Sequence, residues 1–431
     1  MRRLLLLAAL ACSSPAVAAS RSVDKGDTAW LLVATLLVVM MAMPGLGLFY
    51  GGLVRAKNML SILTQVMGVA AVTMLVWLGW GYSLAFSGGN AWVGDTAKAF
   101  FRGIGPDSLA DTFTAGVAIP ELLFAAFQMV FAAVTVAIIL GALAERVRFA
   151  ALLAFTFLWV TIVYAPIAHM VWAPNGLIFG LGAIDFAGGT VVHINAGIAG
   201  LVGVAFAGSR IGFLKEAMPP HSLTLTLVGT GLLWVGWFGF NAGSALEANG
   251  SAAIAMVNTM IAPAAGVIAW LGIERLRSGK ASALGGASGA IAGLVAITPA
   301  AGTSGFAAGA LLGAAGALAC YGFVGSLKNK LRLDDSLDAF GIHGVAGIVG
   351  SVGTAIVSAP SLGGFATASD YAIGHQLGVQ LAAVGIAAAW SAAGSTVCFA
   401  IVKRAIGLRV DHDSEREGLD LTQHGERAYA H

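Results

Sequence analysis

Charged side chains are scarce in this sequence. Asp, Glu, Lys and Arg make up 10% of its 431 residues, whereas soluble proteins contain about 25%. With 58% hydrophobic residues and a mean hydropathy of +0.87, the chain has more apolar surface than a globular core of this size can bury. Lipid must be the solvent for most of it, which predicts an all-α membrane protein in a lipid bilayer. The net charge of +2 does not indicate a nucleic-acid partner.

Cysteine is also scarce. Of the three cysteines, Cys12 lies near the N-terminus, and Cys320 and Cys398 lie in apolar runs. Their spacing matches neither a disulfide framework nor a metal site. We therefore expect buried free thiols, no metal and no cofactor.

The N-terminus has the pattern of a secretory signal. MRRLLLLAALACSSPAVAAS combines two arginines, an apolar run too short to span a bilayer, and small residues. We expect residues 1–18 to be a signal peptide cleaved after Ala18. Residues 19–404 are then the membrane domain, and residues 405–431 a cytoplasmic regulatory tail.

Windows of about 20 apolar residues predict eleven transmembrane helices. Their expected limits are 28–54, 60–87, 119–143, 149–172, 191–208, 222–243, 253–274, 282–299, 304–326, 338–358 and 376–403. Apart from Arg2 and Arg3, 17 of the 21 Lys and Arg residues fall in alternate loops or in the tail. The positive-inside rule then places the N-terminus outside, which is periplasmic for a bacterial inner (plasma) membrane, and the C-terminus in the cytoplasm.

Two histidines inside apolar spans are followed by near copies of one segment. HINAGIAGLVG begins at His193 and HGVAGIVGSVG at His343, 150 residues later (343 − 193). Five spans separate the copies, so the second must run in the opposite direction. This predicts two inverted five-helix repeats, about 28–208 and 222–358, plus one extra C-terminal helix, with a shared site near the midplane.

An ionisable residue within a membrane is usually functional, although a lone His often only joins helices by a hydrogen bond. We keep that structural role for the unpaired His169. Paired neutral imidazoles can relay protons, ligate a metal or haem, or hydrogen-bond a small polar permeant. Haem cytochromes usually bring paired His ligands for each haem, often two per helix, whereas each helix here offers one. The pattern favours a pore over a bis-His haem oxidoreductase.

Aromatic and hydroxyl residues lie within the predicted span three and toward the outer ends of spans four and six. FQMVFA contains Phe131, GWFGFNAGS contains Trp237, Phe240 and Ser244, and HMVW ends at Trp172. Aromatic faces bind cations with about 0.5–2 kcal/mol each, so this mouth suits a small hydrogen-bonding cation. Two further residues begin the His helices, where we expect carboxylates to cap free N–H groups: Asp185 and Asp338.

These motifs resemble the ammonium transporter family, which includes the rhesus proteins. The resemblance rests on DFAGGTVVHINAGIAGLVG (185–203), GWFGFNAGS (236–244), DAFGIHGVAGIVG (338–350) and the tail GLRVDHDSEREGLDLTQHGERAY. It implies an eleven-helix homotrimer with one pore per subunit, ammonium or ammonia as permeant, methylammonium as analogue, and a cytoplasmic PII-type signal protein as partner. Leu337 departs from relatives that carry a small polar residue or a thiol there.

The resemblance also implies roles for individual residues. Trp172, Phe131 and Ser244 would bind ammonium, and Phe131 with Phe240 would form a gate. The remaining residues would line, wall or support the pore: His193, His343, Trp237 and Asp185. The presence of both Trp172 and Ser244 favours the ammonium-transporter branch over the rhesus branch.

The implied function is that ammonium is deprotonated at the mouth and ammonia crosses, with or without separate proton transfer along the histidines. The protein would not be an enzyme. An alternative is an ammonium sensor, although such sensors often carry a signalling domain after the last span, and few residues follow Lys403 here. The tail mixes apolar residues with both charge signs, so we expect it to dock near Arg148, Arg210 and Lys215 rather than to stay disordered.

Overall fold

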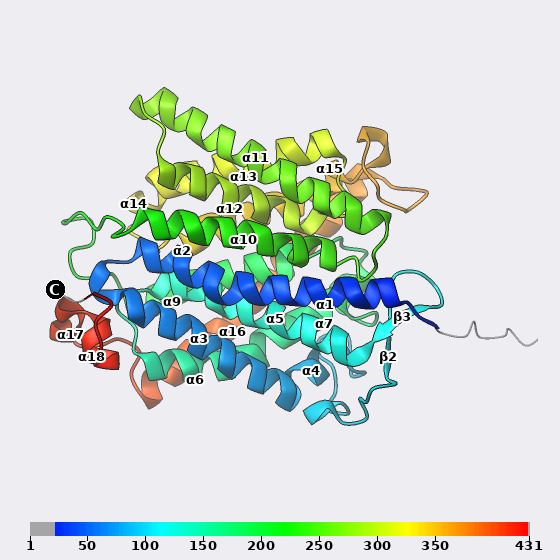
Figure 1. The fold of residues 1–431 in the computed structure, drawn as a ribbon, viewed down its shortest axis with the longest axis horizontal. Coiled ribbons are helices and arrows are strands. Elements are labelled where there is room, and N and C mark those ends of the chain that lie inside the picture. Colours follow the sequence, from blue (N-terminus) through cyan, green and yellow to red (C-terminus); the bar gives the residue numbers. More distant parts are fainter. Residues whose placement is uncertain (1–21, 430–431) are drawn as a thin grey trace, which may run out of the picture.

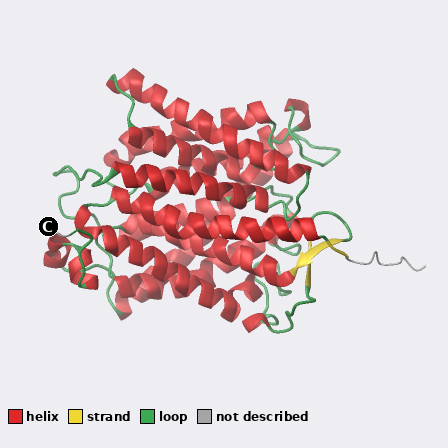
Figure 2. Ribbon diagram, viewed as in Figure 1, coloured by secondary structure: helices red, strands yellow, loops and turns green. Residues whose placement is uncertain are grey.

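The computed structural model describes residues 22–429; the expected signal peptide lies outside the described residues. The helices run roughly side by side along the long axis of the molecule (Figures 1 and 2). Two short helices of the tail, α17 (His412–Glu417) and α18 (Leu419–His424), lie at one end of the bundle. A small sheet lies at the other. We call these the tail end and the sheet end.

Within residues 22–429, eleven helices are long and apolar enough to cross a membrane, as predicted. They span Lys25–Leu53, Ala56–Phe86, Glu121–Leu143, Phe149–Gly180, Gly189–Ala207, Leu223–Gly243, Gly250–Ser278, Ala283–Ala300, Phe306–Lys330, Phe340–Val357 and Ile373–Ala405. The clearest difference concerns span four, which was expected to end at Trp172. Its apolar segment continues to Gly180 through the short helix α8 (Leu177–Gly180).

Several spans are composite. Span one joins α1 (Lys25–Met40), η1 (Met41–Gly45) and α2 (Leu46–Leu53). Span two joins η2 (Ala56–Asn58), α3 (Met59–Val76), η3 (Trp77–Gly81) and α4 (Tyr82–Phe86). Span four joins α6 (Phe149–Trp159), η5 (Val160–Tyr164), α7 (Ala165–Trp172) and α8. Span nine joins α13 (Phe306–Gly322), η8 (Phe323–Leu327) and α14 (Lys328–Lys330).

The two histidine spans are built alike. Span five is η6 (Gly189–Ile194) followed by α9 (Asn195–Ala207), and span ten is η9 (Phe340–Gly344) followed by α15 (Val345–Val357). Each begins with a π-helical turn, and the histidine lies inside that turn. Such turns are rare and occur often at functional sites.

The remaining spans are simpler. They are α5 (Glu121–Leu143), α10 (Leu223–Gly243), α11 (Gly250–Ser278), α12 (Ala283–Ile297) with η7 (Thr298–Ala300), and α16 (Ile373–Ala405). Side chains cap three of them at the N-terminus: Ser222 on α10, Asn249 on α11 and Ser282 on α12. Two short turns, η4 (Ala99–Phe101) and η10 (Pro360–Leu362), lie in loops.

The sheet was not predicted. Its strands β1 (Ser22–Val23), β2 (Leu109–Asp111) and β3 (Val117–Pro120) are ordered β1-β3-β2, with β1 parallel and β2 antiparallel to β3. β3 continues directly into α5, so the sheet ties the start of span one to the start of span three.

Glycine lets the two histidine helices approach closely. A Cβ on Gly197 would lie 2.6 Å from the backbone of Gly344, and one on Gly347 would lie 3.1 Å from the Cβ of His193. Residues that follow one histidine thus contact residues at the other, so the helices cross antiparallel. This is the relation that an inverted repeat requires, and small residues make such close crossing possible in membrane helices.

Candidate functional site

The structure brings the two predicted histidines into direct contact. Nδ1 of His193 lies 3.2 Å from Nδ1 of His343, and the rings are nearly parallel, with centroids 5.3 Å apart. The side chains are buried, with 0% and 5% of their surface exposed. Sequence positions 150 residues apart therefore form one buried pair.

The contact fixes how the pair can share protons. Because two nitrogens form one hydrogen bond, one Nδ1 must donate and the other accept. In the neutral pair, the donating ring then has a free lone pair on Nε2, and the accepting ring carries N–H on Nε2. Nε2 of His193 is buried and has no hydrogen-bond partner within residues 22–429. Such an unsatisfied polar atom calls for an explanation.

Aromatic rings lead from this pair toward the sheet end. The His193 ring lies 5.5 Å from Trp237 and 6.0 Å from Phe240. Phe240 stacks on Phe131, with centroids 4.1 Å apart and 10° between the planes. Phe131 in turn meets Trp172 edge-on at 6.0 Å. The predicted gate residues are thus in contact, and the path beyond them is lined by rings.

Polar groups occupy the sheet-end side of this stack. Ser244 lies one helical turn beyond Phe240, and its hydroxyl donates to the Phe240 carbonyl at 2.8 Å, so its lone pairs stay available. Trp172 donates from Nε1 to the Asp185 carbonyl at 2.9 Å. Gln128, three residues before Phe131 on α5, was not predicted; its side-chain oxygen is buried without a partner in the described part of the chain.

Asp185 caps its histidine helix, as predicted. Its carboxylate accepts from the backbone N–H groups of Gly188 and Thr190, both at 2.9 Å, and from Val191 at 3.2 Å, and it also accepts from the Thr190 hydroxyl. Carboxylates at this position satisfy free N–H groups and complement the helix dipole.

The same role was assigned to Asp338, and that assignment is wrong. Asp335 caps the second histidine helix by accepting from Ala339 N–H at 2.9 Å and Gly341 N–H at 3.0 Å. Asp338 forms an ion pair with Lys328 instead. Asp335 lies 150 residues after Asp185. The same offset separates the two histidines, so it identifies the correct residue. Burial, with the nearby charge of Asp338, raises the pKa of Asp335 to about 6.

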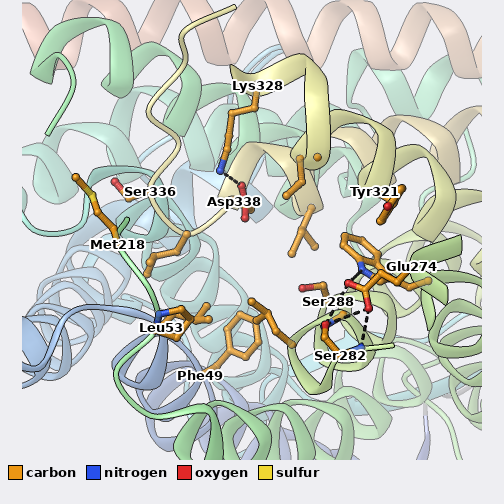
Figure 3. A pocket seen from close by; sticks show the side chains of 18 of the residues that line it. Phe49, Leu53, Met218, Glu274, Ser282, Ser288, Tyr321, Lys328, Ser336 and Asp338 are labelled. Carbon is orange, nitrogen blue, oxygen red and sulfur yellow. Dashed lines mark hydrogen bonds and ion pairs between the residues drawn. The ribbon is translucent and has the colours of Figure 1, made fainter. Parts of the chain in front are cut away.

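A cavity of about 490 Å³ opens on the tail end, beyond the second histidine. Figure 3 shows side chains of Phe49, Ser288, Tyr321 and Asp338 around it. Its lining also includes Ile342, the residue immediately before His343. Leu337, the departure from the family pattern, lies in the same lining. The sequence motifs gave no indication of this cavity, because its residues come from spans far apart in the chain.

His169 has a structural environment, as expected. Nδ1 lies 3.0 Å from the Ala85 carbonyl and Nε2 lies 2.7 Å from the Asn90 carbonyl. The imidazole joins α7 to α4 through Ala85 and to the loop after α4 through Asn90. The cysteines Cys320 and Cys398 are free and buried, also as expected.

The histidine geometry argues against haem. An iron with both histidines as axial ligands would have to lie between two ring nitrogens. In this pair the two Nδ1 atoms are in hydrogen-bond contact, and Gly197 and Gly344 bring the backbones together beside them. A porphyrin has no room there.

Comparison with known proteins agrees with this geometry. The model of the Ammonium Transporter Family matches residues 29–429. The chain belongs to the ammonium transporter family. It is 44% identical to an ammonium transporter of Bacillus subtilis, over 94% of this chain and 98% of the relative, and 43% identical to one of Aquifex aeolicus, over 97% and 96%. It is thus an ammonium transporter, a multi-pass membrane protein and not an enzyme.

Solved structures of the family have the same fold. The crystal structure of Saccharomyces cerevisiae Mep2 matches with a TM-score of 0.80 and 38% identity, covering 90% of this chain and 91% of Mep2. A protein described as "Sensor Amt Protein" matches with a TM-score of 0.85 and 28% identity, covering 93% and 98%. The eleven-helix arrangement is therefore that of the Amt/Mep family.

Proposed function

We propose that this transporter binds ammonium at the sheet end, deprotonates it, and conducts ammonia past the paired histidines to the tail-end cavity. The observation that carries the proposal is the buried His193–His343 pair, in which Nε2 of His193 has no hydrogen-bond partner within residues 22–429. The line of rings from Trp172 through Phe131 and Phe240 leads to that pair.

Ammonium has four N–H donors and no acceptor, so its site needs π faces and free lone pairs. Trp172 and Phe131 offer faces, and a desolvated cation–π contact contributes about 2 kcal/mol. Ser244 offers lone pairs because its own proton is given to the Phe240 carbonyl. The buried oxygen of Gln128 is a further acceptor on the same side of the Phe131–Phe240 stack. We assign ammonium capture to this group of side chains.

Ammonium loses its proton before the narrow passage because burying its charge is costly. The released proton either returns to water at the sheet end, which makes the passage electroneutral, or is relayed separately along His193 and His343, which makes it electrogenic. Beyond the Phe131–Phe240 stack the side chains are buried rings, and an unpaired ion there costs several kcal/mol. Ammonia has one lone pair and three N–H groups. The neutral histidine pair offers one Nε2 lone pair and one Nε2–H, so it can both accept from ammonia and donate to it. Trp237, held by a hydrogen bond to Thr298 at 2.9 Å, walls this passage.

The direction of transport depends on the orientation in the membrane. We propose that the sheet end is periplasmic and the tail end cytoplasmic, because 17 of 21 Lys and Arg residues lie in alternate loops or the tail. Arg55, Arg146 and Arg210 lie after spans one, three and five, at the same end as the docked tail. A bacterial inner membrane fits this arrangement.

The assembly and the protein partner are also proposals. Family membership supports a homotrimer with one pore in each subunit. We propose that a cytoplasmic PII-type signal protein binds the tail end, where the 490 Å³ cavity opens. Cross-linking in membranes tests the trimer, and co-purification with a PII-type protein under nitrogen excess tests the partner.

Uptake of labelled methylammonium tests the proposed function. Cells that lack their own ammonium uptake and express this chain should accumulate the label, and unlabelled ammonium should compete. Absence of uptake from a chain present in the membrane would reject the function. Current in liposomes under an inward ammonium gradient then decides between electrogenic transport, with separate proton transfer, and electroneutral passage of ammonia.

A sensor is the second candidate, favoured by the docked tail and by the similarity to the protein described as a sensor. A sensor would bind ammonium at the same mouth but accumulate little label. Binding of methylammonium without uptake would favour it.

A further inference from the structure

Span eleven lies outside the two repeats, yet one of its side chains reaches the sheet-end mouth. Gln380 on α16 is buried, with 1% of its surface exposed. Its Oε1 accepts from Ile184 N–H at 2.8 Å, and its Nε2 donates to the Ile184 carbonyl at 2.9 Å. One amide thus binds both the N–H and the C=O of a single residue.

The same amide has further partners. Nε2 of Gln380 also donates to the Ser351 carbonyl on α15, at 2.8 Å. Gln376, one turn earlier on α16, donates to Oε1 of Gln380 at 3.2 Å and to the Gly182 carbonyl at 3.1 Å. A glutamine has two donors and two acceptor lone pairs, and all four are used here. Fully satisfied buried polar networks hold their members rigidly.

Ile184 immediately precedes Asp185, which holds two parts of the proposed capture site and pore in place. The Asp185 carbonyl accepts from the Trp172 indole at 2.9 Å. Its carboxylate caps the His193 helix through Gly188 and Thr190. A shift of the peptide at Ile184 would therefore move the hydrogen-bond partner of Trp172.

We propose that Gln380 is a positioning residue for cation capture: through Ile184 and Asp185 it sets the orientation of the Trp172 indole. Span eleven then supplies part of the capture site rather than only a packing surface. The inference rests on the proposed function. That function would depend on Gln380, although Gln380 does not touch the permeant.

Concentration-dependent methylammonium uptake by the full-length protein tests this role. Gln380→Leu keeps the approximate volume but leaves the N–H and the C=O of Ile184 without their side-chain partners. We expect the half-saturating concentration to rise about fivefold or more, at a nearly unchanged maximal rate per molecule in the membrane. Gln376→Leu is the matched control on the same helix, and it should change half-saturation less.

Two further variants separate positioning from general damage. Gln380→Glu, in the neutral form that a buried carboxyl favours, still accepts from and donates to Ile184, so it should restore most of the affinity. In a Trp172→Leu background, Gln380→Leu should add little, because both act through the same indole.

The outcomes are distinguishable. Unchanged half-saturation in Gln380→Leu, a fall in maximal rate alone, or full additivity with Trp172→Leu overturns the positioning role. If Gln380→Leu does not reach the membrane, Gln380→Asn replaces it in both backgrounds, because its amide is one methylene shorter and withdraws from Ile184; unchanged half-saturation in Gln380→Asn then overturns the positioning role. Absence of uptake by the unmodified protein contradicts the proposed function instead.

Discussion

At the scale of single residues, the two histidines carry the clearest functional geometry. Their Nδ1–Nδ1 contact of 3.2 Å leaves Nε2 of His193 buried without a partner in the described residues. A buried polar atom of this kind costs about 1–3 kcal/mol. A protein whose only need was to join two helices would have no reason to keep it. The proposed passage of a hydrogen-bonding molecule would account for it.

His193→Ala and His343→Ala should therefore each change transport without unfolding the protein. Each substitution opens space in the narrow passage and removes a hydrogen-bond partner, so both rate and selectivity should change. The measurement is uptake of methylammonium with competition by other small amines and by potassium. His169→Ala is an instructive contrast, because it should reduce stability rather than selectivity, given its two carbonyl partners. Unaltered rate and selectivity in both alanine variants would refute the paired-histidine pore.

We propose that Trp172 and Ser244 act earlier, at ammonium capture. Trp172→Leu removes a π face and should weaken binding by about 1–2 kcal/mol, which is roughly a 5–30-fold rise in half-saturating concentration. Ser244→Ala removes one acceptor and should have a smaller effect. Trp92→Leu is a suitable control, since Trp92 stacks on Trp390 of span eleven and not on Phe131. Identical concentration dependence in Trp172→Leu and the unmodified protein would leave Trp172 as an interfacial anchor only.

At the scale of elements, sequence alone predicted some features and not others, for physical reasons. Span number follows from the bilayer thickness, which every helix must match, so apolar windows suffice. The antiparallel relation of the histidine helices follows from counting spans. The sheet has strands of two to four residues, too short for a periodic pattern. Contacts such as Trp172 to the Asp185 carbonyl join side chain to backbone and leave no sequence signal.

The two capping acids show the same limit. Asp335 and Asp338 both precede the second histidine span, and proximity to the apolar run favoured Asp338. The backbone decides otherwise, because Asp338 adopts a left-handed conformation with φ of 59° and its carboxylate pairs with Lys328. The 150-residue offset is better evidence than distance from the apolar run, since inverted repeats preserve position.

The two capping carboxylates, Asp185 and Asp335, differ in the number of hydrogen bonds that they accept. The Asp185 carboxylate accepts hydrogen bonds from several backbone N–H groups and from the Thr190 hydroxyl. The Asp335 carboxylate accepts from the backbone N–H groups of Ala339 and Gly341. Asp185→Asn should therefore reduce uptake more strongly than Asp335→Asn, because an amide nitrogen would face N–H donors. Uptake at matched membrane levels measures this, with the remote cap variant Asp24→Asn as control. Equal effects of the two substitutions would contradict the cap hierarchy.

Asp335 also predicts a dependence on pH. Burial and Asp338 raise the pKa of Asp335 from 3.8 to about 6 in the folded protein. Between these values the folded state binds a proton that the unfolded chain releases, so the free energy of unfolding should fall as pH rises through this window. Asp335→Asn stays neutral and should show a shallower decline. Thermal unfolding in detergent at pH 4.5, 5.5 and 6.5 measures it; equal slopes in both proteins would speak against the assignment.

At the scale of the whole molecule, buried ion pairs join the two five-helix repeats at the tail end. Glu145 after span three pairs with Arg55 at 2.6 Å and with Arg210 at 3.3 Å. Arg210 also pairs with Asp334, before span ten, at 2.8 Å. Burial alone would raise the pKa of Glu145, but the two arginines more than offset this and lower it. One network thus links spans one, three, five and ten, and loss of one partner would leave a buried charge unpaired.

The tail docks at the same end of the molecule as this network, although not through the charge pairs that its sequence suggested. Arg148 contacts the tail through the backbone carbonyls of Ile406 and Arg409, but Arg210 is occupied by acids of the membrane domain. The tail instead supplies carboxylates that accept from backbone N–H groups of the membrane domain. Glu415 accepts from Ile211 N–H at 2.7 Å, and Asp420 accepts from Ser61 N–H at the start of α3, also at 2.7 Å. Docking therefore links the tail to the ends of spans two and five.

Truncation after Val410 should leave an inserted protein with reduced or unregulated transport, because it removes the Glu415 and Asp420 carboxylates that bind the membrane domain while the spans remain. Glu415→Gln is the finer test, since it removes the charge that Arg409 pairs with at 2.6 Å, and the exposed Glu417→Gln is its matched control. Methylammonium uptake and PII-type binding should change in the truncation and in Glu415→Gln but not in Glu417→Gln. If the truncated protein transports and binds a PII-type partner like the full chain, the tail does not couple to the pore, and its two carboxylates serve only to hold the tail against the membrane domain.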